Sequence, residues 1–309
     1  MPATLAERLG FARDDRVAIV HADDVGMCHA ANEGAFDALA NGVVSCGSIM
    51  VPCPWFRDAA ERARANPALD LGVHLTLNSE WPHYRWGPVA GRDRVPSLVD
   101  EQGALPRTSL EVVQRAKPEH VEIELRAQIE TALAAGVDVT HLDSHMGTAL
   151  FPPFVSIYAK LAGEYRLPAM AVRPQPSLLE RMGLKAASGV LQQAADAIEA
   201  HGIPVLDGLD LESLSFEPGA GEAHAAKRIG RVAEGVHYFI IHPARESAEI
   251  RAISPDAHAR VFEHEFYGSE RGRAAFAEAG VRTVGMRAIR ELARSQDQRA
   301  SSSGASVRS

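Results

Sequence analysis

Two adjacent carboxylates, Asp23 and Asp24, follow a short run of β-branched and small apolar residues at positions 17–21. That run has the composition of a buried strand, so the two acids fall where the strand should end. Neighbouring carboxylates repel each other, and burial adds to the cost because it disfavours charged groups. A bound cation would remove this conflict. The stretch therefore indicates a metal site, although adjacent acids also occur in solvated loops and at helix N-caps.

Two further strand ends carry side chains that could complete such a site. His74 lies inside the otherwise apolar run 71–77, and His145 ends the polar segment 140–145. Because the carboxyl ends of the parallel strands of a barrel meet at one face, Asp24, His74 and His145 could lie close together. One carboxylate and two imidazoles are a common ligand set for a catalytic divalent ion, with positions left for water and substrate.

Each of these residues also has an ordinary structural interpretation. A single histidine in a strand, such as His74, is more often a hydrogen-bonded core residue than a ligand. The segment from Asp143 to His145 could form a turn capped by its own side chains. The adjacent acids, His74 and the segment ending at His145 all fall at strand ends. One metal site explains these three positions together, whereas the ordinary interpretations need a separate reason for each.

Other polar residues are expected near the same face. His242 ends the apolar run 236–242 and precedes a proline, so its imidazole could protonate a leaving group or only cap the strand. Arg173 ends the run 169–173 and could pair with one of the acids or contact substrate. Cys28 is close to the acids in sequence, but a single cysteine is expected to be a small buried side chain.

The elements that would position these residues alternate between short apolar runs and helical patterns. The candidate strands are residues 17–21, 43–51, 71–77, 137–142, 169–173, 203–207, 236–242 and 281–284. The candidate helices are residues 29–40, 56–65, 119–135, 154–165, 178–200, 222–233 and 268–279. This alternation predicts a parallel sheet with crossover helices, an α/β fold. Seven or eight parallel strands with outer helices favour a (β/α) barrel over an open sheet.

The chain is expected to form one barrel domain over residues 1–294, because no linker interrupts the pattern. Residues 295–309 are rich in Ser, Gln and Arg and are predicted to be a disordered tail. The longest irregular region, residues 78–118, follows the third strand. A loop at that position would lie on the face where barrels usually bind substrate.

The composition excludes several classes of function. The chain has 309 residues, 46% of them hydrophobic, and a formal net charge of −8. An acidic balance argues against nucleic acid or an anionic membrane as the partner. No run approaches the roughly 18 apolar residues that span a bilayer. Three cysteines without a framework spacing, and the lack of a signal sequence, predict a cytoplasmic protein with reduced thiols.

Taken together, these segments resemble the YdjC-type carbohydrate deacetylases, a family that includes chitooligosaccharide deacetylases and hopanoid-associated deacetylases. The similar segments follow the family's order and approximate spacing from about residue 17 to 243. They are His21–Gly26 with Asn32 and Gly34, Gly42–Ser45, Leu71–Leu75, His141–His145 and His242–Pro243.

The resemblance implies a distorted (β/α) barrel that holds one divalent metal ion, zinc or magnesium, although nickel and cobalt also accept such ligands. It implies Asp24, His74 and His145 as metal ligands and Asp23 as the catalytic base, with His242 as a candidate general acid. The implied reaction removes an N-acetyl group from a sugar or sugar conjugate by means of metal-activated water. A homodimer is a further expectation.

One motif departs from the family's pattern. The family commonly continues its third motif as Asp-Ser-His-x-His, whereas this chain has Asp143-Ser-His-Met-Gly147. The ligand position His145 is retained, so the change bears on sugar specificity more than on the reaction. The segment 78–88, which opens the loop 78–118, has no match in the best-known members. Its Trp81 could stack on a sugar ring, or it could pack beneath the loop itself.

Three other functions are compatible with parts of the pattern. A phosphoester hydrolase usually needs a two-metal cluster. A glycosidase needs two opposed carboxylates and no metal. A non-catalytic carbohydrate-binding relative would have lost the base or a ligand, and this chain retains all four residues. The pattern therefore favours the deacetylase.

Overall fold

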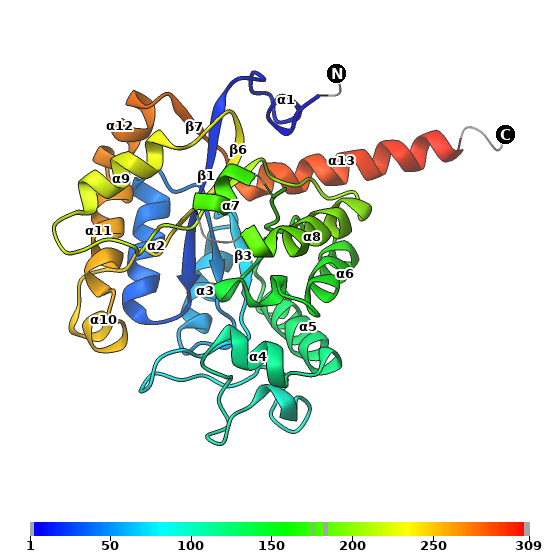
Figure 1. Ribbon diagram of the computed structural model, residues 1–309, viewed down its shortest axis with the longest axis vertical. Helices are drawn as coiled ribbons and strands as arrows, with labels where there is room; N and C mark the ends of the chain where they lie inside the picture. Colours follow the sequence, from blue (N-terminus) through cyan, green and yellow to red (C-terminus); the bar gives the residue numbers. More distant parts are fainter. Residues whose placement is uncertain (1–2, 175, 182–184, 306–309) are drawn as a thin grey trace.

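A parallel seven-stranded sheet forms the centre of the fold in a computed structural model, which describes residues 3–174, 176–181 and 185–305 (Figure 1). The strands are β1 (Arg16–Val25), β2 (Cys46–Ile49), β3 (Leu71–Leu75), β4 (Val139–Ser144), β5 (Gly208–Asp210), β6 (Gly235–Ile241) and β7 (Val281–Thr283). Their order is β4-β3-β2-β1-β6-β5, and β7 pairs with the start of β1.

The sheet curls into a half-barrel, and one further segment runs along its gap. Leu142 at β4 forms a parallel bridge with Ala169, and Val172 forms another with Leu206. The predicted strand 169–173 therefore makes isolated bridges, and the predicted strand 203–207 is replaced by the short β5 just after it. The expected α/β fold of the distorted-barrel type is confirmed.

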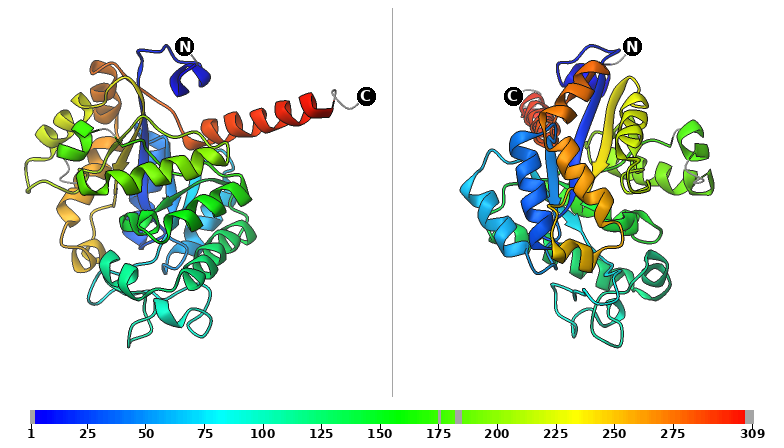
Figure 2. Two further views of the ribbon diagram at one scale, coloured as in Figure 1. Left: turned by 45° about the vertical axis from the view of Figure 1, so that its right-hand side comes forward. Right: turned by 90° about the vertical axis from the view of Figure 1, so that its left-hand side faces the viewer.

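Helices surround this sheet. Figures 1 and 2 show α2 and α11 on one side and α5, α6 and α8 on the other. The α-helices are α1 (Leu5–Arg8), α2 (His29–Asn41), α3 (Phe56–Ala65), α4 (Ser109–Arg115), α5 (Pro118–Ala134), α6 (Val155–Tyr165), α7 (Pro176–Arg181), α8 (Ser188–Ala200), α9 (Gly221–Gly230), α10 (Ala248–Ile253), α11 (Ala257–Tyr267), α12 (Glu270–Glu278) and α13 (Met286–Ala305). Short 3-10 helices are η1 (Pro96–Leu98), η2 (His145–Leu150) and η3 (Lys185–Ala187).

The spacing of apolar residues explains why these helices pack as they do. In α3, the buried residues Phe56, Ala59, Ala60 and Ala63 recur every three to four positions and form one face. The predicted helix 178–200 is divided between α7 and α8, and residues 182–184 lie outside the described residues. No helix in the described part of the chain is both long enough and apolar enough to cross a membrane.

The C-terminal segment differs from the expectation. Helix α13 extends from the body of the protein and continues to Ala305, so residues 295–305 are helical where an irregular tail was expected (Figure 1). Residues 306–309 lie outside the described part. The single domain over residues 1–294 and the disorder of the tail in solution stay predictions.

Strand β1 holds the centre of the sheet and carries a bulge at its end. It pairs with β6 along residues 16–22 and with β2 near its end. Ala22 pairs with Gly47 and Val25 with Ile49, so three steps along β1 match two along β2. Asp24 occupies the left-handed region with φ 62°, a conformation that costs about 1–3 kcal/mol in a non-glycine residue. The bulge breaks the alternation of the strand and lets the adjacent Asp23 and Asp24 both face the interior.

Candidate metal centre

The three expected ligands meet at the end of the sheet. Oδ1 of Asp24 lies 3.5 Å from Nε2 of His74 and 3.4 Å from Nδ1 of His145. Asp24 comes from the bulge of β1, His74 from β3, and His145 from the start of η2, directly after β4. All three side chains are buried, and their ligand atoms lie within 4.8 Å of one another.

The state of Asp24 tests whether this cluster fits a metal. Its Oδ1 is buried and has no hydrogen-bond partner among the described residues, an arrangement that native proteins rarely leave unexplained. A tetrahedral ion with ligand bonds of about 2.0–2.2 Å holds its ligand atoms roughly 3.4 Å apart. The separations from this oxygen to His74 and His145 are close to that value. The ligand set and its spacing therefore fit a tetrahedral divalent ion.

Each of the two imidazoles also lies beside a carboxylate other than Asp24, which is Asp143 for His74 and Glu80 for His145. Nδ1 of His74 donates a 3.0 Å hydrogen bond to Oγ of Ser48 and lies 2.9 Å from Oδ1 of Asp143. Ser48 in turn donates a 2.9 Å hydrogen bond to the other oxygen of Asp143. Nε2 of His145 lies 3.1 Å from Oε2 of Glu80. Histidine ligands of metals commonly donate their other N–H to a carboxylate, which fixes the tautomer. His74 therefore offers Nε2 toward Asp24, and His145 offers Nδ1.

Arg260 determines the charge of Asp24. Its Nη1 donates a 2.8 Å hydrogen bond to Oδ2 of Asp24, and its Nε donates one of 2.9 Å to Asp256. Burial alone would raise the pKa of Asp24. The guanidinium outweighs burial and, with the nearby imidazoles, holds that pKa well below its usual value. Asp24 is therefore a carboxylate with one oxygen paired and the other facing the histidines.

Asp23 lies beside the cluster in a different environment. Its Oδ1 is 2.6 Å from Nδ1 of His21, and its Oδ2 is 3.9 Å from Nε2 of His74 and 3.8 Å from Nε2 of His242. Burial raises the pKa of Asp23 well above its ordinary value, although His74 acts against this shift. The two neighbouring acids therefore differ, because Asp24 is held charged while Asp23 binds a proton more readily.

A buried line of polar groups extends from Asp23 through the interior. Nε2 of His21 lies 2.7 Å from Nε2 of His141, and Nδ1 of His141 lies 2.9 Å from Oγ1 of Thr140. Thr140 donates a 2.5 Å hydrogen bond to Asp70. Burial lowers the pKa of His21 to about 4 and that of His141 to about 3, so both imidazoles are neutral. The ring of His141 fits only because residue 72 is glycine, since a Cβ there would lie 2.7 Å from the ring.

His242 is held by its own set of buried groups. Its Nδ1 lies 2.8 Å from Oγ of Ser213, which donates to the carboxylate of Glu263. Arg228 pairs with Glu263 at 2.9 Å. Because the proton of Ser213 points to Glu263, Nδ1 of His242 donates to Ser213 and Nε2 is left as an acceptor near Asp23. Burial lowers the pKa of His242 to about 3.

Comparison with known proteins identifies the family of this chain. Residues 17–278 match the family described as YdjC-like protein. The chain belongs to the YdjC-like family. A carbohydrate deacetylase of Thermus thermophilus is 36% identical over 252 residues, which cover 82% of this chain and 86% of that protein. A carbohydrate deacetylase of Thermoanaerobacter pseudethanolicus is 27% identical over 236 residues, 76% of this chain and 84% of that protein.

A solved structure supports the fold of this YdjC-like protein. It is an Enterococcus faecalis protein whose name suggests a role in cellobiose-phosphate cleavage, and it superposes with a TM-score of 0.73 at 25% identity. The comparison covers 89% of this chain and 99% of the other. The family resemblance inferred from the motifs is therefore confirmed.

In this YdjC-like chain, the two residues expected to bind substrate differ in their surroundings. The Arg173 side chain is 48% exposed and pairs with Glu199 and Asp196 of α8 rather than with the acids. Trp81 is buried, with the guanidinium of Arg260 5.8 Å from its ring centre. Cys28 is buried, as expected.

Several residues of the site escaped the sequence analysis. His21 stands two positions before Asp23, and His141 two before Asp143, so strict strand alternation would have placed both on the interior face. Arg260 falls on the buried face of α11 with Ala259, a position where a charge needs a partner. Glu80 lies in an irregular segment, and no pattern in the sequence marks it.

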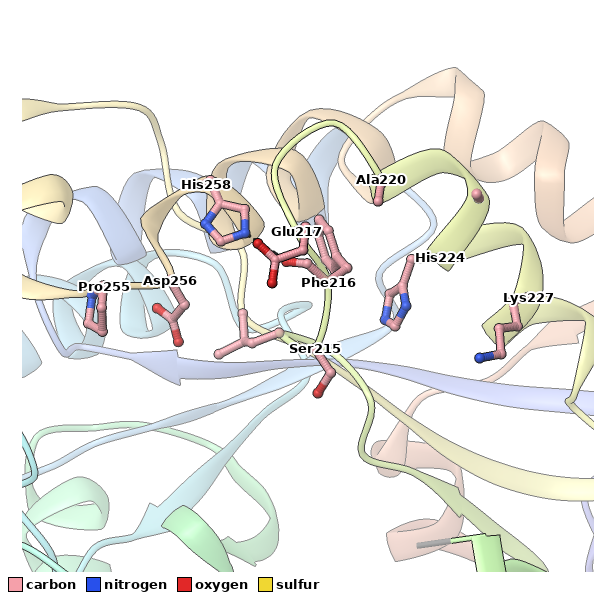
Figure 3. Close-up of a pocket in the computed structure, with 11 residues that line it drawn as sticks. Ser215, Phe216, Glu217, Ala220, His224, Lys227, Pro255, Asp256 and His258 are labelled. Carbon is pink, nitrogen blue, oxygen red and sulfur yellow. Dashed lines mark hydrogen bonds between the residues drawn. The ribbon is translucent and has the colours of Figure 1, made fainter.

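Two hollows lie near the site. One of about 430 Å³ opens beside Asp23 and His242. A wider one of about 660 Å³ lies at the surface between the segment before α9 and the start of α11, where Figure 3 shows His224, Lys227 and His258 around it. None of the predicted ligands or catalytic residues lines this second hollow, so the first is the candidate substrate cavity.

Proposed function

We propose that this protein is a metal-dependent carbohydrate deacetylase that hydrolyses an N-acetyl group on a sugar or sugar conjugate. The observation that carries the proposal is the unpartnered Oδ1 of Asp24, which faces His74 and His145 next to a second acid of opposite pKa shift. The relatives named carbohydrate deacetylase support the substrate class. A cytoplasmic location and a homodimer stay predictions.

Asp24, His74 and His145 would hold one divalent ion. When bound, such an ion would lower the pKa of a water molecule and polarise the acetyl carbonyl. Two imidazole ligands and the near-tetrahedral spacing favour zinc, because magnesium prefers oxygen ligands in octahedral geometry. Cobalt and nickel also suit this ligand set.

Asp23 acts as the general base. Its Oδ1 is anchored by His21, which leaves Oδ2 toward the ligand cluster and His242. A buried carboxylate with a raised pKa is a stronger base than an exposed one, so Asp23 can take a proton from the attacking water. Asp24 would not share this work, because Arg260 binds its Oδ2 and its Oδ1 faces His74 and His145, where it would bind the metal.

His242 moves the proton to the leaving nitrogen. Its neutral Nε2 lies 3.8 Å from Oδ2 of Asp23 and faces the same space. Because His242 binds a proton more weakly than Asp23 does, the negative charge that develops on the departing nitrogen would draw the proton from Asp23 through this imidazole. In the balanced reaction, water adds its oxygen to the acyl carbon, the C–N bond breaks, and one proton of the water ends on the amine. Arg173, which lines the cavity beside Asp23 and His242, would contact the substrate, whereas the buried Trp81 packs against Arg260.

Metal content and acetate release test the proposal together. The purified protein is expected to release acetate from N-acetylated chito-oligosaccharides, and a chelator should abolish this activity until zinc is restored. Asp23→Asn should keep the metal and lose turnover on the order of 10²–10⁴-fold. Asp24→Asn should lose the metal, whereas the exposed Asp93→Asn serves as the control. Near-full activity of Asp23→Asn would refute the base assignment, and activity indifferent to chelation would refute the metal site.

A further inference from the structure

Glu263 is a buried acid on α11, beside His242 at the end of β6. Its carboxyl oxygens accept hydrogen bonds from Oγ of Ser213 at 2.8 and 2.9 Å, from the backbone N–H of His242 at 2.7 Å and from Nη1 of Arg228 at 2.9 Å. Burial raises the pKa of Glu263, although Arg228 and the backbone N–H of His242 act against this shift. Because hydrogen bonds to the charged form favour that form, three donors around one carboxyl group indicate a carboxylate.

A buried arginine supports this carboxylate. Arg228 of α9 pairs with Glu263 and also donates a 2.7 Å hydrogen bond through Nε to Asp210 at the end of β5. Its guanidinium lies 4.2 Å from the ring centre of Phe239 and donates to the carbonyl oxygen of Ile240. Two carboxylates around one guanidinium leave one negative charge in excess. The imidazole at the end of β6 therefore lies against a buried group of net negative charge.

Ser213 connects this carboxylate to the imidazole. Its Oγ lies 2.8 Å from Nδ1 of His242. A serine hydroxyl has one proton, and the charged acceptor Glu263 takes it because hydrogen bonds to ionised groups are the stronger ones. A lone pair of Ser213 then faces Nδ1, so the neutral ring must carry its proton there. The ring therefore presents an unprotonated Nε2 to the space that it shares with Asp23, 3.8 Å away.

The same face of α11 also holds an acid of the candidate metal centre. Arg260 stands three positions before Glu263, and residues at that spacing are neighbours on one face of a helix. Both side chains are buried. Arg260 binds Oδ2 of Asp24, whereas Glu263 binds the backbone and, through a serine, the ring of His242. One helix thus fixes the position of a candidate metal ligand relative to the proposed proton carrier.

We propose that Glu263 is a positioning residue for the reaction and that, acting through Ser213, it fixes the orientation and the tautomer of His242 so that Nε2 can receive a proton. The effect on turnover rests on the proposed deacetylase function, whereas the tautomer can be measured without turnover. Arg228 holds Glu263 in place and keeps it charged. A purely structural role for these groups would join α9 to α11 and leave the ring proton of His242 unaffected.

Imidazole ¹⁵N NMR of the full-length protein tests the tautomer directly. Protonated and unprotonated ring nitrogens differ in chemical shift, and His242→Gln identifies the signals of this ring. The wild-type ring is expected to carry its proton on Nδ1. In Glu263→Gln the side-chain amide would donate to Ser213, whose own proton would turn to Nδ1 and leave the ring proton on Nε2. A wild-type ring protonated on Nε2, or the same tautomer in both proteins, would overturn the proposal.

Turnover separates positioning from packing. Ser213→Ala keeps both buried charges and removes only their link to the ring, so kcat for acetate release should fall by roughly 10- to 100-fold while KM changes little. Ser213→Thr, which keeps a hydroxyl group, should recover much of the loss. Ser215→Ala, at an exposed position of the same loop, is the matched control. A wild-type kcat in Ser213→Ala, or a Ser213→Thr protein that is no faster, would overturn the role of the hydroxyl.

The outcomes distinguish this proposal from the deacetylase function. If the wild-type protein releases no acetate, the deacetylase function is overturned, and the tautomer measurement alone decides the role of Glu263. If Glu263→Gln fails to fold, Ser213→Ala takes its place in the NMR experiment, where loss of the single Nδ1 tautomer is expected and its persistence would overturn the proposal. Glu265→Gln, at an exposed position of the same helix, is the control and should keep the wild-type tautomer.

Discussion

Arg260 donates a 2.8 Å hydrogen bond to Oδ2 of Asp24, and this bond directs the other carboxylate oxygen toward His74 and His145. The adjacent Asp23 makes no such pair and is instead held by His21. Two acids that are neighbours in sequence therefore have different partners, Arg260 of α11 for Asp24 and His21 of β1 itself for Asp23. The division of roles proposed for them follows from these partners rather than from the carboxylates themselves.

Removal of this arginine should make the stability of the protein depend on metal. Arg260→Gln leaves Asp24 as a buried charge without its guanidinium, and the metal-free variant should lose about 3–5 kcal/mol of unfolding free energy. Zinc should restore part of the loss by supplying positive charge. Calorimetric melting with and without zinc measures both effects. Arg251→Gln, at an exposed ion pair on α10, is the control. A metal-free Arg260→Gln protein that melts like the wild type would contradict the assigned role.

Metal binding should release a proton from His145. Burial lowers the pKa of this imidazole, but the carboxylates of Glu80 and Asp24 outweigh burial and raise it to about 10. The metal-free protein therefore holds His145 protonated near neutral pH, and a metal must displace that proton. Titration calorimetry in two buffers of different ionisation enthalpy should show about one proton released per metal from this group. Glu80→Gln should lower the number, and a binding enthalpy independent of buffer would refute the prediction.

The buried neutral histidines should make the protein sensitive to acid. Burial holds the pKa values of His21, His141 and His242 at about 4, 3 and 3, below about 6.5 in the unfolded chain. As pH falls below that value, the unfolded state binds more protons, so stability decreases by about 1.4 kcal/mol per pH unit for each histidine. His242→Gln should reduce this slope by about one such increment. Denaturant unfolding of both proteins between about pH 6.5 and 4 measures it. Parallel slopes would exclude a neutral His242.

The buried line of polar groups should support both folding and turnover. Thr140→Val keeps the shape of the side chain but leaves His141 and Asp70 without their shared partner. The unfolding free energy should fall by about 1–3 kcal/mol. Because His21 then loses its fixed orientation toward Asp23, kcat should fall while KM changes little. Thr131→Val on α5 is the control. A stable variant with unchanged kcat would show that the line does not position the base.

The clustering of the three candidate ligands could be predicted because parallel strands bring their carboxyl ends to one face. Asp24, His74 and His145 each occur where an apolar run ends, so their meeting follows from the fold class. The bulge could not be predicted, because it depends on the left-handed conformation of Asp24, a residue type that only occasionally adopts it. Strict alternation would have placed Asp23 and Asp24 on opposite faces.

The side chains that contact the candidate ligands from distant parts of the chain could not be predicted from the sequence, for a different reason. Arg260 is 236 positions from Asp24, and which helix face meets the barrel mouth depends on packing rather than on local pattern. The helical part of residues 295–305 was not predicted because these residues have almost nothing to bury, although Gln, Arg and Ala are good helix formers. The predicted strand 203–207 does not coincide with the observed β5, because residues 169–206 contribute only isolated bridges to this part of the barrel and the regular strand begins at Gly208.

Four hydrogen bonds join Asp23, His21, His141, Thr140 and Asp70 in one line, and each needs one proton. Neutral His21, neutral His141 and the hydroxyl of Thr140 supply three protons for these four hydrogen bonds. If both carboxylates were ionised, one of the four contacts would therefore lack a proton, and two lone pairs would face each other. One extra proton completes the line. On Asp23 it makes a carboxylic acid, and on His21 it makes an imidazolium that faces a carboxylate base. The line thus holds one shared proton, and the charge of Asp23, the proposed base, depends on all the groups along it.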